Sequence, residues 1–379
     1  MIASVFIGLC VLLAVAPLRR GGVLGFMVFM YCFLASELPF LALYYIVEST
    51  AQGAIQGNVN TPMGWAAVGL AAAAVLGTAV ILARELRAGA VLDSALAEGL
   101  GTAMVPRRAG RLPWARILIC PVLMRRRGVR RVANISYGDA GRHNRLDVYQ
   151  RRSPVAGAPV LVHFHGGGMV IGKKNRESLP LLYHLASQGW VCISASYRLR
   201  DAAQFTDRLI DVKKVIAWAR QHGADYGANP DTLILTGTSS GGQLAALAGF
   251  TQNDPRFQPG FANVDTSVSA VVYLGGFYGF PGAAWSPLEA GAADAPPFLI
   301  IHGKNDSVVP VEYARQFAGK LRRESPSPVV YAEIPGAQHA FDRFHTISFD
   351  TIVTAIESFA AWTVASRDGS GARARRRAS

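Results

Sequence analysis

A serine lies at the centre of a Gly-x-Ser-x-Gly pentapeptide formed by Gly237, Ser239 and Gly241. The apolar run 232–235 precedes it and the Ala/Leu-rich segment 243–250 follows it, so the pentapeptide falls at a predicted strand-to-helix turn. A serine at such a turn stands above the end of a sheet, and the flanking glycines leave room for both backbones. The pattern indicates a nucleophilic Ser239, although a structural Gly-rich turn can have the same pattern.

Two loops farther along the chain carry the partners that such a serine needs. Asp306 follows the apolar run 298–301, and His339 follows the run 329–334. The order serine, aspartate, histidine is that of one hydrolase architecture and differs from the orders in the chymotrypsin and subtilisin folds. Either residue alone would be an ordinary loop side chain. Together they predict a triad in which His339 is the base and Asp306 orients it.

A Gly-rich bend, His165-Gly166-Gly167-Gly168, leaves another apolar run upstream of the serine. Glycines allow backbone N–H groups to point at a developing oxyanion without an intervening side chain. The expected donors are Gly167, Gly168 and Ser240, with Gly166 as a possible substitute. A phosphate loop would need a Lys-Ser/Thr pair, which is missing here, and His163 with His165 lacks a grouped third metal ligand. We expect no metal and no organic cofactor.

Hydrophobic residues make up 51% of the 379 residues and charged ones only 17%, and the apolar excess is concentrated at the start of the chain. The segments 1–18 and 65–83 contain no charge, and 21–47 contains only Glu37. Each approaches or exceeds the ~20 residues that cross a bilayer as a helix. We expect three membrane spans within a region 1–83. The alternatives are a cleaved signal peptide for the first segment and a buried helical domain for all three.

Arginines follow the third apolar segment and contribute to a net charge of +13. The loop 48–64 contains no Lys or Arg, so the positive-inside rule predicts a multi-pass cell-membrane protein whose residues after 83 lie in the cytoplasm. The segment 84–131 is expected to lie as a basic amphipathic stretch on an anionic leaflet and to help cover the active site. The basic tail 367–379 is expected to be disordered. No base-reading motif accompanies the charge, so nucleic acid is not an expected partner.

The segment 132–366 alternates apolar strands with helices. Predicted strands are 132–137, 145–149, 159–164, 190–196, 232–235, 268–274, 297–302 and 329–334, and predicted helices are 180–188, 205–222, 243–250, 311–323 and 349–365. Such alternation predicts an α/β domain with a doubly wound, mostly parallel sheet covered on both faces. Active groups then lie beyond the carboxyl ends of the strands.

These motifs resemble the α/β-hydrolase fold, and within it the carboxylesterases of the hormone-sensitive-lipase and feruloyl/carboxylesterase-like groups. The likeness covers about 135–365 and depends on His-Gly-Gly-Gly at 165–168 and Gly-Thr-Ser-Ser-Gly-Gly at 237–242, where Ser240 replaces the usual alanine. The motif Tyr-Arg-Leu-Ala-Pro-Glu is present only as Tyr197-Arg198-Leu199-Arg200-Asp201. Apolar spans ahead of such a domain resemble membrane-anchored actinobacterial esterases.

The resemblance implies acyl transfer from an ester or lipid-like small molecule, with Ser239, Asp306 and His339 as catalytic residues and the bilayer as a partner. A serine peptidase or an acyltransferase could use the same residues. A binding protein on this fold would have lost a triad member, whereas all three are present here. The physiological ester, its chain length and the oligomeric state stay open.

Overall fold

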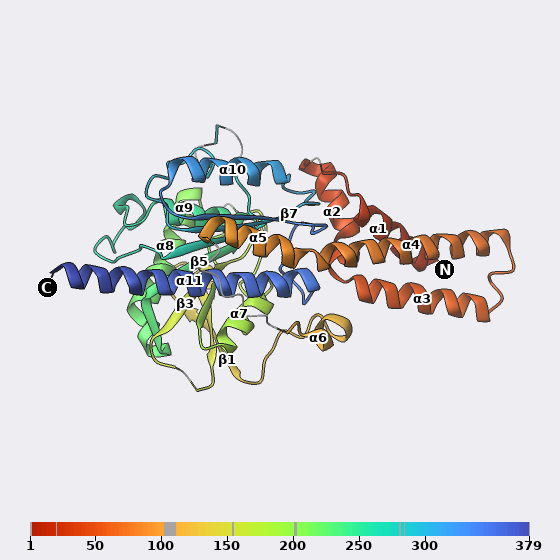
Figure 1. The fold of residues 1–379 in the computed structure, drawn as a ribbon, viewed down its shortest axis with the longest axis horizontal. Helices are drawn as coiled ribbons and strands as arrows, with labels where there is room; N and C mark the ends of the chain where they lie inside the picture. Colours follow the sequence, from red (N-terminus) through yellow and green to blue (C-terminus); the bar gives the residue numbers. More distant parts are fainter. Residues whose placement is uncertain are drawn as a thin grey trace.

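The protein is described by a computed structural model in which an α/β domain lies at one end and a group of apolar helices at the other (Figure 1). The described residues are 2–19, 21–101, 111–153, 155–200, 203–279, 282–283 and 285–378. The predicted basic stretch therefore lies partly outside the described residues, at 102–110.

The α/β domain is built on an 8-stranded sheet of order β1-β2-β4-β3-β5-β6-β7-β8. Its strands are β1 (Val129–Ser136), β2 (Arg145–Arg151), β3 (Ala158–Phe164), β4 (Val191–Ala195), β5 (Ala228–Thr238), β6 (Ala270–Leu274), β7 (Phe298–Gly303) and β8 (Val329–Ile334). Strands β4, β3 and β5 to β8 are parallel, whereas β2 is antiparallel to both β1 and β4. The mostly parallel sheet predicted from the sequence is confirmed, and its carboxyl edge gathers the loops after β3, β5, β7 and β8.

Helices cover both faces of this sheet. They are α5 (Ala88–Leu100), α7 (Leu179–Ser187), α8 (Phe205–His222), α9 (Ser240–Phe250), α10 (Val311–Glu324) and α11 (Ile347–Ala378), with short 3-10 turns at Gly141–His143, Gly223–Tyr226 and Pro255–Phe257. Val160, Val162 and Phe164 of β3 pack into the cluster that contains α8, α9 and α10. Leu161 points the other way, into the cluster that contains α5, α7 and α11. Alternate side chains of a strand thus pack into two hydrophobic cores, one on each face of the sheet, because side chains point to opposite faces with a period of two residues.

Helix α5 belongs to the α/β domain, which differs from the prediction that 84–131 is a juxtamembrane stretch on a lipid surface. Ala88, Leu92, Ala95 and Leu96 are buried in the same cluster as β8 and α11. Three- and four-residue spacing places these side chains on one helical face, and that face packs on the sheet. Strand β1 also begins at Val129, before the expected boundary at 132.

The apolar N-terminal region forms α1 (Ile2–Val15), α2 (Gly22–Glu37), α3 (Pro39–Ile55) and α4 (Pro62–Leu86). Three straight spans are not what the described residues form. Helix α1 has 14 residues, fewer than the ~20 that cross a bilayer. Helices α2 and α3 meet at an angle of 83°, and Pro39 explains this break because proline cannot continue a helix through its own position. One helix, Pro62–Leu100, is long and apolar enough to span, or up to two if the bent pair counts as one span.

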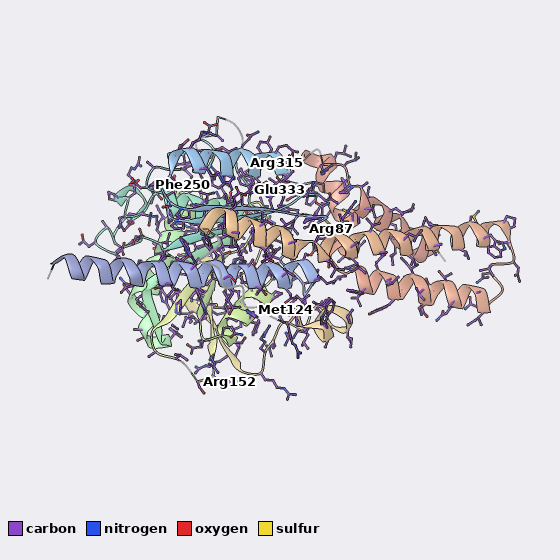
Figure 2. The ribbon with its side chains drawn as sticks, in the orientation of Figure 1. Arg87, Met124, Arg152, Phe250, Arg315 and Glu333 are labelled. Atoms are coloured by element: carbon purple, nitrogen blue, oxygen red, sulfur yellow. The ribbon has the colours of Figure 1, made fainter. Side chains whose placement is uncertain are left out.

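Helix α4 continues with little interruption into α5 and so joins the two parts of the molecule. Arg87 lies at this junction (Figure 2). Two residues earlier, the buried Glu85 carboxylate accepts hydrogen bonds from the backbone N–H groups of Ile347 and Ser348. These are among the unpaired N–H groups at the start of α11, which a carboxylate stabilises. The helical group is therefore held to the α/β domain by a defined polar contact as well as by packing.

Two segments at the periphery of the α/β domain are helical rather than irregular. Helix α6 (Trp114–Ile119) lies before β1, and Trp114, Ile119, Val122 and Leu123 around it are exposed. At the other end, the described backbone of α11 is helical through Ala378, and the disorder expected for 367–379 stays a prediction. The tail is rich in Ala and Arg, which are among the strongest helix formers.

The Tyr197-Arg198 segment is fixed by a buried ion pair. The Arg198 guanidinium donates to both carboxylate oxygens of Asp211 at 2.9 Å, and Asp211 is fully buried. Arg198→Ala leaves this carboxylate uncompensated and is expected to lower the free energy of unfolding by about 3–5 kcal/mol in urea titrations. Arg256→Ala, which breaks an exposed ion pair with Asp254, is the control and should leave the unfolding midpoint unchanged. Equal stability of both variants would contradict this role of Arg198.

Candidate active site

Ser239 stands between the last residue of β5 and the first residue of α9, with φ 53° and ψ −122°. A positive φ is costly for a residue with a side chain, and such strain persists only where the surroundings enforce it. Here the Ser239 N–H donates to the Leu274 carbonyl at 3.2 Å, and its carbonyl accepts from the Phe277 N–H at 3.0 Å. A Cβ on Gly241 would lie 2.1 Å from the Phe164 carbonyl oxygen, which explains that glycine.

The three residues predicted to form a triad lie in one hydrogen-bonded chain. His339 Nε2 is 3.1 Å from Ser239 Oγ, and His339 Nδ1 is 2.7 Å from Asp306 Oδ2. A carboxylate can only accept, so Nδ1 carries the proton and Nε2 presents its lone pair to the serine hydroxyl. Asp306 is fully buried, His339 is nearly so, and Ser239 is partly exposed. The serine is therefore the member that a small molecule can reach.

The Asp306 carboxylate is held charged by its neighbours. Its Oδ1 accepts from the N–H groups of Val308 and Val309 at 2.9 and 2.8 Å. Burial alone would raise its pKa, but the charge and hydrogen bonds of His339 and His302 hold that pKa well below its ordinary value. His302 Nε2 also donates to the Val309 carbonyl at 2.9 Å. The loop after β7 is thus built around a permanent negative charge.

The surroundings of His339 stabilise the protonated form of its ring. Burial would lower its pKa, whereas the charges of Asp306, Glu177 and Asp342 and the hydrogen bond that Nδ1–H donates to Asp306 raise it, and the net pKa lies above the ordinary 6.5. The imidazolium is therefore stabilised beside the serine, as a general base requires when it accepts a proton.

The Gly-rich loop after β3 is shaped by a carboxylate and an aromatic ring. Gly167 and Gly168 have φ values of 103° and 62°, and a Cβ on Gly167 would meet the Ile171 carbonyl oxygen at 2.1 Å. The Gly166 N–H donates to Glu177 Oε2 at 2.5 Å, so this group already has a partner and does not serve as a substitute donor. His165 stacks on Tyr197, with ring centroids 4.6 Å apart, and its carbonyl accepts from the Tyr197 hydroxyl at 2.8 Å.

A buried polar cluster lies behind this loop. Possible ligand atoms of His163, Glu177 and Asp342 lie within 4.8 Å of one another. The second Glu177 oxygen accepts from Arg343 at 2.8 Å, and Asp342 Oδ2 accepts from the hydroxyls of Ser178 and Thr238 at 2.5 and 2.7 Å. Asp342 Oδ1 and both ring nitrogens of His163 have no hydrogen-bond partner among the described residues. Because the other three carboxylate oxygens already have donors, we interpret the cluster as a hydrogen-bonded clamp between the Gly-rich loop and the serine turn. Burial raises the pKa of Glu177 to about 7, and the Asp342 charge adds to this shift.

The sequence did not identify several of the residues that position the triad. Gln338 Oε1 accepts from the backbone N–H groups of Ser307 and His339 at 2.7 and 3.0 Å, and so joins the aspartate and histidine loops. His302 and Glu177 were also missed. Gln338 and His302 lie within a few residues of the motifs, which is a usable signal, whereas Glu177 follows no spacing rule.

The helical group also contacts the triad, through α2. The Phe29 ring packs edge to face on the His339 ring, with centroids 5.9 Å apart and an interplanar angle of 83°. The sequence assigned the cover of the site to 84–131; the described contact with His339 comes from α2 instead. Physically, an apolar helix that covers a site and one that spans a bilayer have the same composition, so the sequence could not distinguish them.

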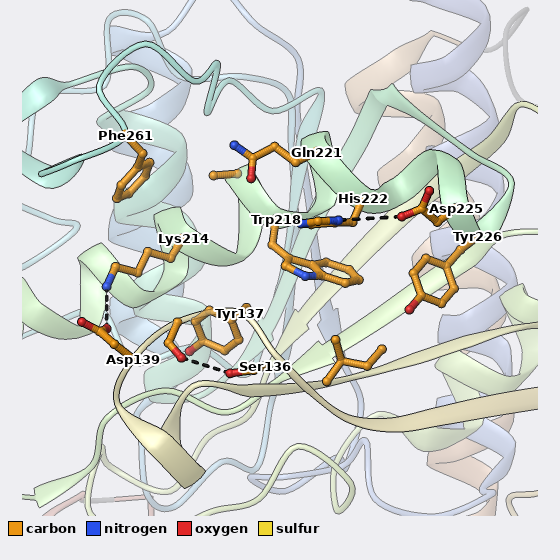
Figure 3. A pocket seen from close by; sticks show the side chains of 13 residues that line it. Ser136, Tyr137, Asp139, Lys214, Trp218, Gln221, His222, Asp225, Tyr226 and Phe261 are labelled. Atoms are coloured by element: carbon orange, nitrogen blue, oxygen red, sulfur yellow. Dashed lines mark hydrogen bonds and ion pairs between the residues drawn. The ribbon is translucent and has the colours of Figure 1, made fainter.

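A large surface hollow lies away from this chemistry. It has a volume of about 770 Å³ and contains none of the three triad residues (Figure 3). Trp218, His222 and Tyr226 of the α8 region line one side, and the Lys214–Asp139 ion pair of 3.0 Å closes part of the rim. We assign no role to this hollow. The candidate active site is instead marked by the hydrogen-bonded serine, histidine and aspartate.

Part of the chain is similar to known esterases. The BD-FAE family model matches residues 146–280. The probable carboxylic ester hydrolase LipM of Mycobacterium tuberculosis is 41% identical over 259 residues, covering 60% of this chain and 60% of the relative. Esterase LipQ of the same organism is 35% identical, covering 62% of this chain and 63% of the relative. The matched part thus spans about three fifths of the length of these curated relatives.

Solved structures show the same fold. An esterase of Thermogutta terrifontis with butyrate bound superposes with a TM-score of 0.54 at 23% identity, covering 62% of this chain and 94% of that one. A truncated carbohydrate esterase from gut microbiota superposes with a TM-score of 0.53 at 21% identity, covering 62% and 96%. By its sheet and its helices, the chain has the α/β-hydrolase fold, and part of it is similar to the BD-FAE family and to esterases.

Proposed function

We propose that the protein is a membrane-anchored serine carboxylesterase. The observation that carries the proposal is the hydrogen-bonded chain from Ser239 through His339 to the buried Asp306 carboxylate. Relatives named as carboxylic ester hydrolase or esterase, at 35 to 41% identity, support the same chemistry.

The proposed reaction has two acyl-transfer steps. As Ser239 Oγ attacks the ester carbonyl carbon, His339 Nε2 takes the hydroxyl proton, and this proton then passes to the departing alkoxide. Water, deprotonated by the same nitrogen, attacks the acyl-enzyme and releases the acid and the free serine. Asp306 keeps the imidazole in the required tautomer and stabilises its positive charge.

The oxyanion of each tetrahedral intermediate is assigned to the backbone N–H groups of Gly167, Gly168 and Ser240. Ser240 is the first residue of α9, where N–H groups lack helical partners and the helix dipole favours negative charge. Its hydroxyl accepts from the Met169 N–H at 3.3 Å, which ties the two halves of the proposed hole together. Serine in place of the usual alanine therefore has a local use.

Membrane attachment rests on the apolar helical group. Pro62–Leu100 passes the length and composition test for a span, and only 28% of its most apolar part is buried by the protein. Exposed Trp65, Leu76 and Val80 would face lipid. We propose that α4 anchors the enzyme and that the α/β domain lies on the cytoplasmic side, where the arginines after α4 would be retained.

The test of this function is hydrolysis of p-nitrophenyl esters from acetate to palmitate by the detergent-solubilised full chain. Turnover is expected for at least part of this series, and it should disappear in Ser239→Ala. Folded protein with no turnover on any ester would overturn the proposal and favour a peptidase, an acyltransferase or a binding role.

The pH profile follows from the charge of His339. The base must be neutral at Nε2, so kcat/KM falls as pH decreases through the pKa of His339. Because that pKa lies above its ordinary 6.5, the midpoint of the acid limb should also lie above 6.5. Rates measured from pH 5 to 9 on a short soluble ester give this midpoint, and a midpoint below 6 would contradict the assignment.

Glu177 is expected to act as a positioning residue for the Gly-rich loop. Glu177→Ala removes the acceptor of the Gly166 N–H and should lower kcat by about 10-fold to 10²-fold. This decrease is no larger than the decrease in kcat caused by removing one oxyanion donor. Glu177→Gln keeps an acceptor oxygen and should retain most of the activity. KM for a short ester should hardly change in either variant, whereas equal activity of all three proteins would exclude this role.

A further inference from the structure

Helix α2 packs across the loops that carry the triad. Just before it, Arg19 donates to the Lys304 carbonyl at 3.2 Å, and Gly21 lies against Pro310. Along the helix, the Phe29 ring meets His339, and the Cys32 thiol accepts from Gln338 Nε2 at 3.3 Å. The contacts thus extend from the aspartate loop to the histidine loop, and α2 forms part of the active-site wall.

A further residue of α2, Phe33, is linked to the Gly-rich loop through Arg343 and Glu177. Phe33 packs on Phe344, with ring centroids 6.0 Å apart, and the Arg343 guanidinium lies 5.9 Å from the Phe33 ring centre. Arg343 in turn donates to Glu177, whose other oxygen holds the Gly166 N–H. Helix α2 therefore contacts His339, Gln338 and Arg343 directly, and it reaches Glu177 only through Arg343.

The remaining surface of α2 is apolar and uncovered by the protein. Leu24, Met27, Met30, Tyr31 and Leu34 are between 46% and 58% exposed. Helix α2 contains no basic residue, and Glu37, at its carboxyl end, is buried. A helix that presents apolar side chains both to a catalytic histidine and outward is suited to lie in hydrocarbon or at its boundary.

We propose that α2 forms the wall of the substrate pocket and holds the hydrocarbon chain of a membrane-dissolved ester beside His339. The substrate class is then an ester with a chain of lipid length, which enters the site from the bilayer rather than from water. The proposal rests on the esterase function above. It makes Phe29 a specificity-determining residue, since its ring is the part of α2 that touches His339.

A kinetic test compares two aromatic truncations on α2. In Phe29→Ala, kcat/KM for p-nitrophenyl palmitate should fall by on the order of 10-fold or more relative to acetate, because an apolar pocket wall is lost. Phe29→Leu should restore most of the long-chain preference. Tyr31→Ala is the matched control, because Tyr31 packs on Phe6 of α1 at 6.2 Å and is 49% exposed. It should leave the palmitate-to-acetate ratio unchanged. An unchanged ratio in Phe29→Ala would overturn the proposal.

A positional test does not depend on turnover. A long-chain alkyl phosphonate that carries a diazirine near the end of its chain is attached to Ser239 in full-length protein in phospholipid vesicles and then photolysed. Crosslinks are expected in the peptide that contains residues 22–37. Attachment at Ser239 with crosslinks only within the α/β domain would overturn the role of α2 and leave the esterase function intact. Failure of the probe to attach would instead count against the esterase function, so the two failures are distinguishable.

Discussion

Replacing Ser239 with alanine is expected to lower kcat for ester hydrolysis by about 10⁶, to the level of residual catalysis by binding and the oxyanion donors. The physical reason is that Oγ forms the covalent bond to the acyl group, and it is the hydroxyl that lies 3.1 Å from His339 Nε2. Removal of one hydroxyl from this partly exposed position should cost little stability.

The measurement for Ser239→Ala is initial rate on p-nitrophenyl butyrate, with Ser153→Ala as the matched control on an exposed turn. The control should retain the wild-type rate, and both variants should have the wild-type melting temperature. A loss smaller than about 10² in Ser239→Ala would mean that a different nucleophile performs the reaction.

Asp306→Asn is expected to give the second largest loss, about 10⁴ in kcat. In the wild type, the carboxylate accepts the Nδ1 proton of His339 at 2.7 Å and so leaves Nε2 free to accept the serine proton. An asparagine amide can donate to Nδ1 and thereby favours the tautomer with the proton on Nε2, which cannot act as a base. The ring then faces Ser239 with a donor in place of a lone pair.

The Asp306 charge is the largest influence that raises the pKa of His339, and Asp306→Asn removes it. Burial still lowers that pKa in the variant. The acid limb of kcat/KM should therefore move to lower pH in Asp306→Asn, even as the plateau falls. Asp294→Asn, on an exposed loop, is the control and should change neither. A variant that keeps the wild-type plateau would show that His339 is not oriented by Asp306.

The sequence could predict that Ser239, Asp306 and His339 meet because each lies on the turn or loop that follows an apolar strand, whereas their action as a triad stays a prediction. The strand and helix of the serine turn, 232–235 and 243–250, have unambiguous composition, and two predicted elements, 205–222 and 329–334, coincide with α8 and β8. Parallel strands then bring Asp306 and His339 to the same edge of the sheet, whatever their separation along the chain. Pattern and topology were sufficient to predict the fold and the meeting of these three side chains at one edge of the sheet.

The supporting groups could not be predicted in the same way. Glu177 and Asp342 are 165 residues apart in the chain and meet only because β3, α7 and the loop after β8 converge. Helix α2 reads from its composition as part of a membrane span, and hydropathy does not indicate its contact with His339. Helix α5 was misplaced because arginines around it masked its one apolar face.

The most direct test of a serine-centred esterase site is to find the residue that a carbonyl-mimicking phosphonate ester modifies. The full-length protein is treated with the phosphonate, digested, and mapped by mass spectrometry, with His339→Ala treated in parallel. We expect a single modification on Ser239 in the wild type, formed at a rate that falls as pH is lowered, and strongly slowed modification in His339→Ala. Modification of another residue, or labelling of Ser239 that does not depend on His339, would contradict the proposed triad.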